Sequence, residues 1–246
     1  MSLQSMLVGD YHLDTQFGVY IDTSMMFNKP AKDVEVINIP GRDGALVVDY
    51  GTFQNVIITV PCFIHGDFDT KFTALINYLG SIRGYTTIRF TNDWDHYRTA
   101  APIMAQTPTV RRVNEDGWFD LSFNCKPFRY RRDGERVVRF NADTIYLTNP
   151  TRFDAFPLLS ISGYGNITIN GTEVEIAQHP SGIIYIDCER MTIMGSLGPN
   201  YEPADYVTFP SGEYPRLTGG TTSIINVDRT HISDAGNYML TNWREL

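Results

Sequence analysis

The sequence predicts a mainly β protein of two domains, and three observations favour this fold class. The chain has 246 residues, whereas a single domain usually has about 100–150. It is rich in aromatic residues, with 14 Tyr and 14 Phe, and in turn formers, with 20 Gly and 13 Pro. Its 42% hydrophobic and 20% charged residues are typical of a folded globular protein. We therefore expect many short strands joined by tight turns.

The first half of the chain begins with strand-like runs. Residues 17–21 and 34–39 are predicted strands, and the alternation of the second predicts that one of its faces is buried. Residues 46–50 and 53–63 are also predicted strands, with a turn at Gly51 between them.

A turn is predicted between the strands at 34–39 and 46–50. It consists of Pro40, Gly41, Arg42, Asp43 and Gly44. Proline fixes its own φ angle, the two glycines permit positive φ angles, and the aspartate can bond its own downstream backbone. These residues therefore predict a tight reversal of the chain.

One segment has the period of an amphipathic helix. Apolar residues recur at spacings of three and four from Phe68 to Ile82, and Asp67 stands at the position of an N-terminal cap. The helix should have about four turns and end before Arg83. Strands predicted after it close the first domain near Phe128, and they cover residues 85–90, 103–113 and 118–126.

A charge-rich stretch, residues 129–136, separates the two halves. An exposed connection between domains has this composition, so we predict an N-terminal domain over residues 1–132 and a C-terminal domain over 133–246. The basic residues would also suit contact with phosphates or with an acidic patch on a neighbouring subunit. Asp133 and Glu135 interrupt the basic run, which favours the solvated connection.

The second half has strand-like runs with turns about every ten residues, a spacing that predicts a β-sandwich. Its clearest local signal is Asn170-Gly171 between two alternating runs, because this pair tolerates the positive φ angles of a type I′ hairpin turn. The predicted strands cover residues 137–140, 144–147, 157–162, 166–169, 174–176, 183–187 and 191–194.

Charge and cysteine content argue against several classes of protein. A net charge of −8 disfavours a nucleic-acid-binding face. Cys62, Cys125 and Cys188 form no close pair of the kind that binds zinc or builds a disulfide framework. No run approaches the roughly 18 apolar residues of a membrane span, and the first residues lack a secretory leader. We therefore expect assembly in reducing cytosol and no membrane partner.

No motif predicts catalysis, a cofactor or a metal. A nucleophile elbow and a phosphate-binding glycine loop are both missing, and the five histidines stand singly. We therefore assign no catalytic, cofactor-binding or metal-binding residues. The tightest polar cluster, residues 92–97, has two interpretations: a sugar or ion site, or a loop whose polar side chains cap backbone amides. Turn chemistry favours the second.

Seven short sequence motifs occur in a characteristic order along the chain. They are Phe17–Ile21, Ile39–Gly44, Asp49–Asn55, Ile169–Thr172, Ile184–Glu189, Gly212–Leu217 and Trp243–Leu246. Together they resemble the siphophage distal tail (Dit) protein family over nearly the whole chain, with departures at Gly219–Thr222 and Asn242. The resemblance implies an N-terminal β-sandwich-type domain with one α-helix and a β-hairpin, followed by a galectin-like C-terminal β-sandwich.

The resemblance implies a structural, non-enzymatic virion protein without cofactors. Such a protein is made in the host cytoplasm and forms a homohexameric ring at the distal end of a siphophage or prophage tail. The ring joins the tail tube to the tail-tip or baseplate hub proteins, and DNA passes through it without specific binding.

A ring of identical subunits requires two different patches that meet around the circle, often through hairpins or edge strands. Our candidate for such a patch is the β-rich segment on either side of the turn, and the candidate site residues are Pro40, Gly41, Arg42, Asp43 and Gly44. The alternative is that this turn serves only its own domain.

Two other functions compete with the ring subunit. A carbohydrate-binding module is suggested by the sandwich signals and by aromatic residues that can stack on sugars, with Trp94, Tyr201 and Tyr206 as candidates. A glycoside hydrolase or tail lysin would need two carboxylates placed in a cleft, which the sequence does not reveal.

Overall fold

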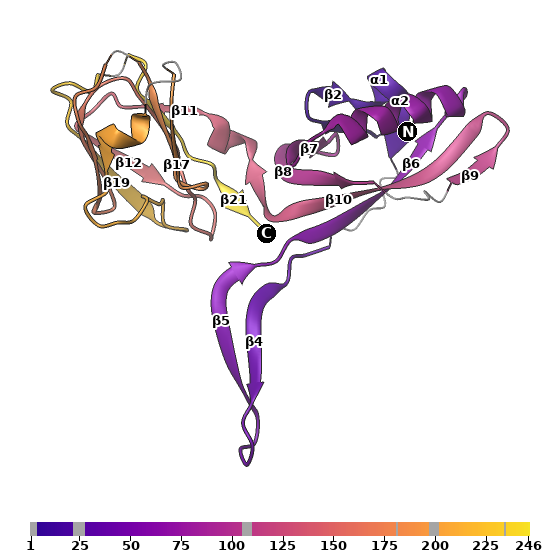
Figure 1. Cartoon of the computed structure of the whole chain (residues 1–246), viewed down its shortest axis with the longest axis horizontal. Helices are drawn as coiled ribbons and strands as arrows, with labels where there is room; N and C mark the ends of the chain where they lie inside the picture. The colour runs from indigo at the N-terminus through magenta and orange to yellow at the C-terminus, as the bar shows by residue number, and fades with distance from the viewer. Residues whose placement is uncertain (1–3, 22–27, 105–109, 181, 197–201, 234) are drawn as a thin grey trace. The chain divides into compact units, whose positions relative to one another are not determined.

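The computed structural model describes residues 4–21, 28–104, 110–180, 182–196, 202–233 and 235–246. The chain divides into two compact units, unit 1 with residues Met1–Arg129 and Leu246, and unit 2 with residues Tyr130–Glu245. Figure 1 shows that both units are built mainly from strands, so the predicted mainly β fold class is confirmed. The boundary expected at residue 132 lies in the short 3-10 helix η1 (Arg132–Glu135), which directly follows strand β10.

Unit 1 is built around a curled antiparallel sheet. The strand order is β2-β1-β7-β8-β10-β6-β3, and β9 pairs with β10 outside this path. The core contains side chains from this sheet and from two helices. The strands of the sheet are β1 (Met6–Val8), β2 (Tyr11–His12), β3 (Val19–Ile21), β6 (Val56–Ile64), β7 (Thr86–Phe90), β8 (Asp93–Ile103), β9 (Val110–Val113) and β10 (Asp116–Arg131).

The predicted amphipathic helix is α2 (Phe68–Ser81), and it buries Phe68, Leu75 and Leu79. Asp67 stands at its N-cap position as expected, with a φ of 49°, but its side chain makes no capping bond. No helix in the described part of the chain is long and apolar enough to cross a membrane.

A second, short helix was not expected. Helix α1 (Leu13–Phe17) buries Leu13 and ends at Gly18, whose φ of 64° lets its N–H bond the Asp14 carbonyl at 2.9 Å. Phe17 therefore belongs to a helix, and the strand expected over 17–21 begins only at Val19.

Residues 93–97 of the polar cluster lie in a strand and not in a loop. Phe90 pairs with Asp93, so only Thr91 and Asn92 form the turn between β7 and β8. Of the strand expected over 103–113, residues 105–109 lie outside the described residues, and the described part is divided between β8 and β9.

The predicted turn at 40–44 lies between strands β4 (Lys32–Asn38) and β5 (Ala45–Phe53), which form a separate two-stranded sheet. We call this hairpin, residues 32–53, the arm. Gly51 does not form a turn between two strands as expected. It has a φ of 72° and lies inside β5, where the register of pairing with β4 shifts between Lys32 and Val34. A glycine with positive φ at such a shift is typical of a bulge.

Unit 2 is a β-sandwich around one core. One sheet has the order β11-β20-β13-β16-β17 and the other the order β12-β19-β14-β15-β18. The predicted Asn170-Gly171 turn is confirmed, with φ angles of 51° and 85° between β14 and β15. The strands are β11 (Val137–Arg139), β12 (Thr144–Thr148), β13 (Leu158–Ile161), β14 (Gly165–Ile169), β15 (Thr172–Ile176), β16 (Ile184–Asp187), β17 (Thr192–Gly195), β18 (Val207–Thr208), β19 (Thr222–Val227), β20 (Tyr238–Leu240) and β21 (Arg244–Glu245), with 3-10 helix η2 (Pro203–Tyr206) before β18.

Candidate functional site: an exposed apolar arm

The arm is the most unusual surface of the described chain, because apolar side chains are exposed on both of its faces. Val36 and Val47 are opposite each other and are each 59% exposed. The prediction that β4 buries one face is therefore wrong. The alternation of polar and apolar residues correctly predicts a strand, but no second layer of structure covers the apolar face of β4. Figure 1 shows β4 and β5 as a long ribbon with only each other as neighbours along most of their length.

The pairing register assigns each side chain to a face. Because side chains alternate along a strand, Val34, Val36 and Val47 lie on one face, which we call the valine face. The other face carries Ile37 and Leu46, and we call it the isoleucine face. An isolated two-stranded hairpin is marginally stable in water, and exposed apolar patches of this kind mark interaction sites.

The predicted site residues form the tip of the arm, and all five are exposed. The Arg42 N–H donates to the Ile39 carbonyl at 3.2 Å, and Gly41 has a φ of 79°. Proline followed by a residue of positive φ inside such a bond is a type II turn. The tip therefore fixes the reversal of the chain, whereas the apolar surface lies on the strands behind it.

The strands behind the tip belong to the β-rich segment that we expect to form the contact, but their individual residues were not predicted, although a signal was present. Val34 and Val36 occupy one phase of the alternation, while Ile37 and Ile39 occupy the other. Apolar residues in both phases indicate a strand that is covered on two sides, as in the middle of a larger assembly.

Polar contacts hold the base of the arm. Tyr50 Oη donates to Glu35 Oε2 at 2.6 Å, which raises the pKa of Tyr50. The Gly51 N–H and Lys32 Nζ both bind the Asp49 carboxylate, at 2.9 and 3.0 Å, and together lower the pKa of Asp49. These polar contacts lie at the end of the arm opposite the tip.

Side chains of the polar cluster at residues 92–97 contact one another and side chains of neighbouring strands. The Asp93 carboxylate contacts His96 Nδ1 at 2.5 Å and accepts a bond from Arg129 at 3.1 Å. The Trp94 ring packs against His12 and lies 5.2 Å from the Arg89 guanidinium. These side-chain contacts join β2, β7, β8 and β10. The loop that the second interpretation expects is therefore wrong, because residues 93–97 lie in β8.

The remaining aromatic candidates for sugar stacking are Tyr206 and Tyr201. Tyr206 is half-buried and lies 6.0 Å from the His179 ring. Tyr201 lies outside the described residues.

The described residues contain no group of three or more His, Cys, Asp or Glu side chains placed to hold a metal ion. Cys62, Cys125 and Cys188 are buried and unpaired with one another. Burial raises the pKa of all three thiols, that of Cys125 to about 11.

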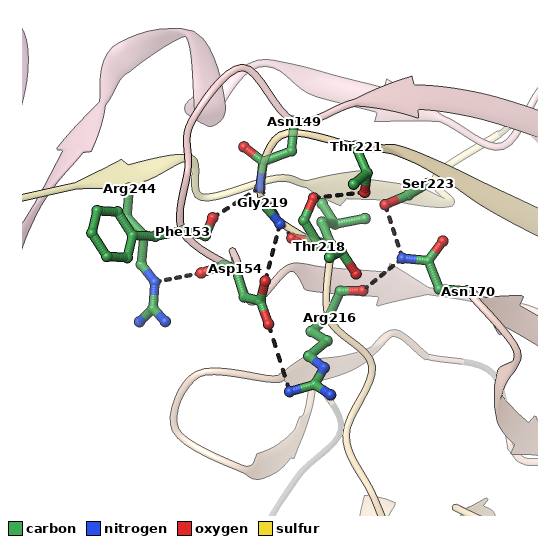
Figure 2. Close-up of polar contacts among 11 residues, drawn as sticks. Asn149, Phe153, Asp154, Asn170, Arg216, Thr218, Gly219, Thr221, Ser223 and Arg244 are labelled. Atoms are coloured by element: carbon green, nitrogen blue, oxygen red, sulfur yellow. Dashed lines mark hydrogen bonds and ion pairs between the residues drawn. The ribbon is translucent and has the colours of Figure 1, made fainter. Parts of the chain in front are cut away.

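The densest polar network of unit 2 connects backbone segments rather than lining a cleft (Figure 2). Asn149 donates to the carbonyls of Phe153 and Leu217, both at 3.0 Å. The Asp154 side chain accepts the Gly219 N–H at 3.0 Å and lies 3.5 Å from Arg216. These bonds fix the loop before β13 against the segment before β19.

Comparisons with known proteins agree on one architecture. No family model and no curated protein sequence matches the chain. A crystal structure of the Dit protein (gp 19.1) of phage SPP1, described as a paradigm of the hub adsorption apparatus in phages that infect Gram-positive bacteria, matches 100% of both chains with 12% identity and a TM-score of 0.70.

Two further solved structures show the phage p2 baseplate in its activated conformation. The one with Sr matches 97% of this chain and 98% of its own, with 12% identity and a TM-score of 0.53. The one with Ca matches the same shares, with 11% identity and a TM-score of 0.50. The chain therefore has the fold of the phage Dit and baseplate hub proteins.

Proposed function

We propose that this chain is a member of the Dit family and a structural subunit of a phage tail. Six copies form a ring at the distal end of a siphophage or prophage tail and join the tail tube to the tail-tip or baseplate proteins. The N-terminal unit builds the inner ring, and the C-terminal unit is a galectin-like domain outside it. The protein is made in the host cytoplasm, catalyses no reaction and becomes part of the virion.

The observation that carries this proposal is the arm with two exposed apolar faces. Burying apolar surface contributes about 25 cal/mol per Å², and large exposed patches on soluble proteins generally mark contact surfaces. An arm that is apolar on both sides gains this stabilisation only when another surface covers it. A subunit of an assembly provides such a surface.

The arm also suits a ring in its geometry. A projecting arm and the surface that accepts it are different patches of one chain, so their contact is heterologous. Heterologous contacts repeat from copy to copy and close into a ring when the rotation allows it. The tip residues Pro40–Gly44 set the length and end of the arm, and we assign them to this interface.

The charge of the chain suits a conduit for DNA. At a net charge of −8, the subunit has little tendency to bind phosphates, so DNA can pass through the ring without binding to it. The partners of the ring are the tail tube on one side and the hub proteins on the other.

Removal of the arm tests the proposal. The Gln54 N–H donates to the Ala31 carbonyl at 2.9 Å, so the chain ends on either side of the arm are adjacent. Residues 32–53 can therefore be replaced by Asn-Gly, which forms a tight hairpin turn. Light scattering should show that the full chain forms hexamers and the shortened chain remains monomeric.

The melting temperature of the shortened chain is the control, because the core of unit 1 contains no residue of the arm. It should stay within a few degrees of that of the full chain. A shortened chain that folds and still forms hexamers would exclude the arm as the ring interface.

A further inference from the structure

The turn between β14 and β15 contains the only Asn-Gly pair of the sequence, and both of its residues are exposed. A peptide nitrogen that follows an asparagine can attack the side-chain amide carbon of that asparagine. Glycine obstructs this attack least, because it has no Cβ. At Gly171 an added Cβ would meet nothing within 4 Å, so neighbouring segments do not shield the turn. Asn170 is therefore the asparagine of this chain whose amide is lost most easily when nothing holds it.

This reaction, deamidation, needs only water and base. Base removes the proton of the Gly171 N–H, the nitrogen forms a bond to Asn170 Cγ, and the side-chain nitrogen leaves as ammonia with a proton from solvent. The product is a five-membered succinimide ring. Water then opens the ring at either carbonyl, which leaves an aspartate or an isoaspartate.

In the folded chain, hydrogen bonds hold the Asn170 side chain against β19 and the loop before it (Figure 2). The amide nitrogen donates to Ser223 Oγ at 2.9 Å and to the Arg216 carbonyl at 3.2 Å. The amide oxygen accepts the Ile224 N–H at 3.1 Å, and the Asn170 N–H donates to the Ile224 carbonyl at 3.0 Å. Asn170 is thus bonded to β19 through both its main chain and its side chain.

We propose that Asn170 is a deamidation site that the folded C-terminal unit keeps unreactive. The attack makes the planar Cγ tetrahedral and turns the amide nitrogen from a donor of two bonds into leaving ammonia. The bonds to Ser223 and Arg216 must therefore break before the reaction is complete. Deamidation then requires the turn to separate from β19, so its rate reports local opening at this corner of the sandwich. The inference holds whether or not copies of the chain form a ring.

Deamidation also removes the contacts that oppose it. Neither product has the side-chain N–H groups of Asn170, so the Arg216 carbonyl loses its donor. An isoaspartate in addition inserts an extra carbon into the main chain of a turn that has only Asn170 and Gly171 between the paired strands. Modified copies should consequently have a looser β14–β15 turn than unmodified ones.

Mass spectrometry of proteolytic fragments measures the reaction. The full chain is kept at pH 8, either folded in buffer or unfolded in urea, and the deamidated fraction of Asn170 is followed over time. We expect the folded chain to react at least tenfold more slowly. Asn166 is the internal reference, because the β-branched Ile167 that follows it obstructs the attack in both states. Equal rates at Asn170 in the folded and unfolded chain would overturn the proposal.

The variant Ser223→Ala tests the side-chain contact itself. It removes one acceptor of the Asn170 amide and should raise the rate in the folded chain about fivefold, the effect of losing one ordinary hydrogen bond, while the rate in urea stays the same. The matched control is Ser160→Ala on β13, because Ser160 and Ser223 both have 0% exposure but lie in different sheets. It should react like the wild type. Equal rates in the two folded variants would show that the contact with Ser223 does not protect Asn170.

Discussion

Ile37 and Leu46 lie directly opposite each other across β4 and β5, and their side chains remain 39% and 44% exposed. A cross-strand pair of this kind normally contributes to a core, whereas here it faces solvent in the single chain. Its value to the protein must therefore come from an interface.

The double variant Ile37→Thr/Leu46→Thr should weaken self-association without unfolding the arm. Threonine favours strands, but it removes apolar area worth about 2 kcal/mol or more at an interface. The concentration needed for assembly, measured by light scattering, should rise at least tenfold.

A matched control exists in unit 2. Tyr146 and Ile224 form an exposed cross-strand pair on β12 and β19. The variant Tyr146→Thr/Ile224→Thr should assemble like the wild type. Equal effects of the two double variants would show that general surface apolarity, and not the arm, governs association.

Gly41→Val should loosen the arm alone. A β-branched residue at the φ of 79° found at Gly41 is strained by about 1–3 kcal/mol, and no atom within 4 Å would clash with the added Cβ. Hydrogen exchange should show lower amide protection in β4 and β5 and unchanged protection in β6 and β10. Gly80→Ala in α2, where a Cβ also meets nothing within 4 Å, should leave the arm unchanged.

Asn149→Ala should destabilise unit 2 by about 2 kcal/mol. The buried Asn149 side chain donates to two carbonyls and accepts the Thr151 N–H at 2.9 Å, and a buried N–H without a partner costs about 1–3 kcal/mol. Urea unfolding followed by the fluorescence of Trp243, with Trp94 and Trp118 replaced by Phe, reports on unit 2 only.

The control for that change is Asn166→Ala. The Asn166 side chain is exposed and donates a hydrogen bond to the half-buried Glu173 carboxylate at 2.8 Å. Its loss should change the unfolding free energy by less than about 0.5 kcal/mol. If both alanine variants behave alike, the network around Asn149 does not stabilise the sandwich.

The three thiols should be inert in the folded protein at pH 8. Burial raises the pKa of the Cys125 thiol to about 11, so very little of the reactive thiolate forms at that pH, and the raised pKa values of Cys62 and Cys188 act in the same direction. Ellman's reagent should report no fast-reacting thiol in the native chain and three after denaturation. A rapid native reaction would show that one of these thiols is accessible.

Local signals in the sequence predicted much of the fold. The Asn170-Gly171 pair determines its own turn, because few other pairs tolerate two positive φ angles, and the spacing of Phe68, Leu75 and Leu79 reveals the buried side of α2. Asp93 was placed in a loop because polar residues surround it. It lies in strand β8, whose backbone pairs with β7, and its carboxylate also bonds Arg129 on β10, which is distant in the sequence.

The candidate site was predicted only in part. The residues of the tip were identified because proline and glycine signal a turn locally. The exposure of both arm faces depends instead on what packs over Val36 and Ile37, and alternation along a strand carries no information about a covering layer. The sequence therefore predicts the segment on either side of the tip as a contact, whereas the exposed side chains on each of its faces are identified only by the structure.

The central claim is that copies of this chain close into a ring through their arms. The most direct test is light scattering of the purified full chain on a sizing column over a concentration series, followed by negative-stain imaging of the heaviest peak. We predict a species of six chains with a central hole. A monomer at every concentration, or an open filament without a hole, would contradict the account.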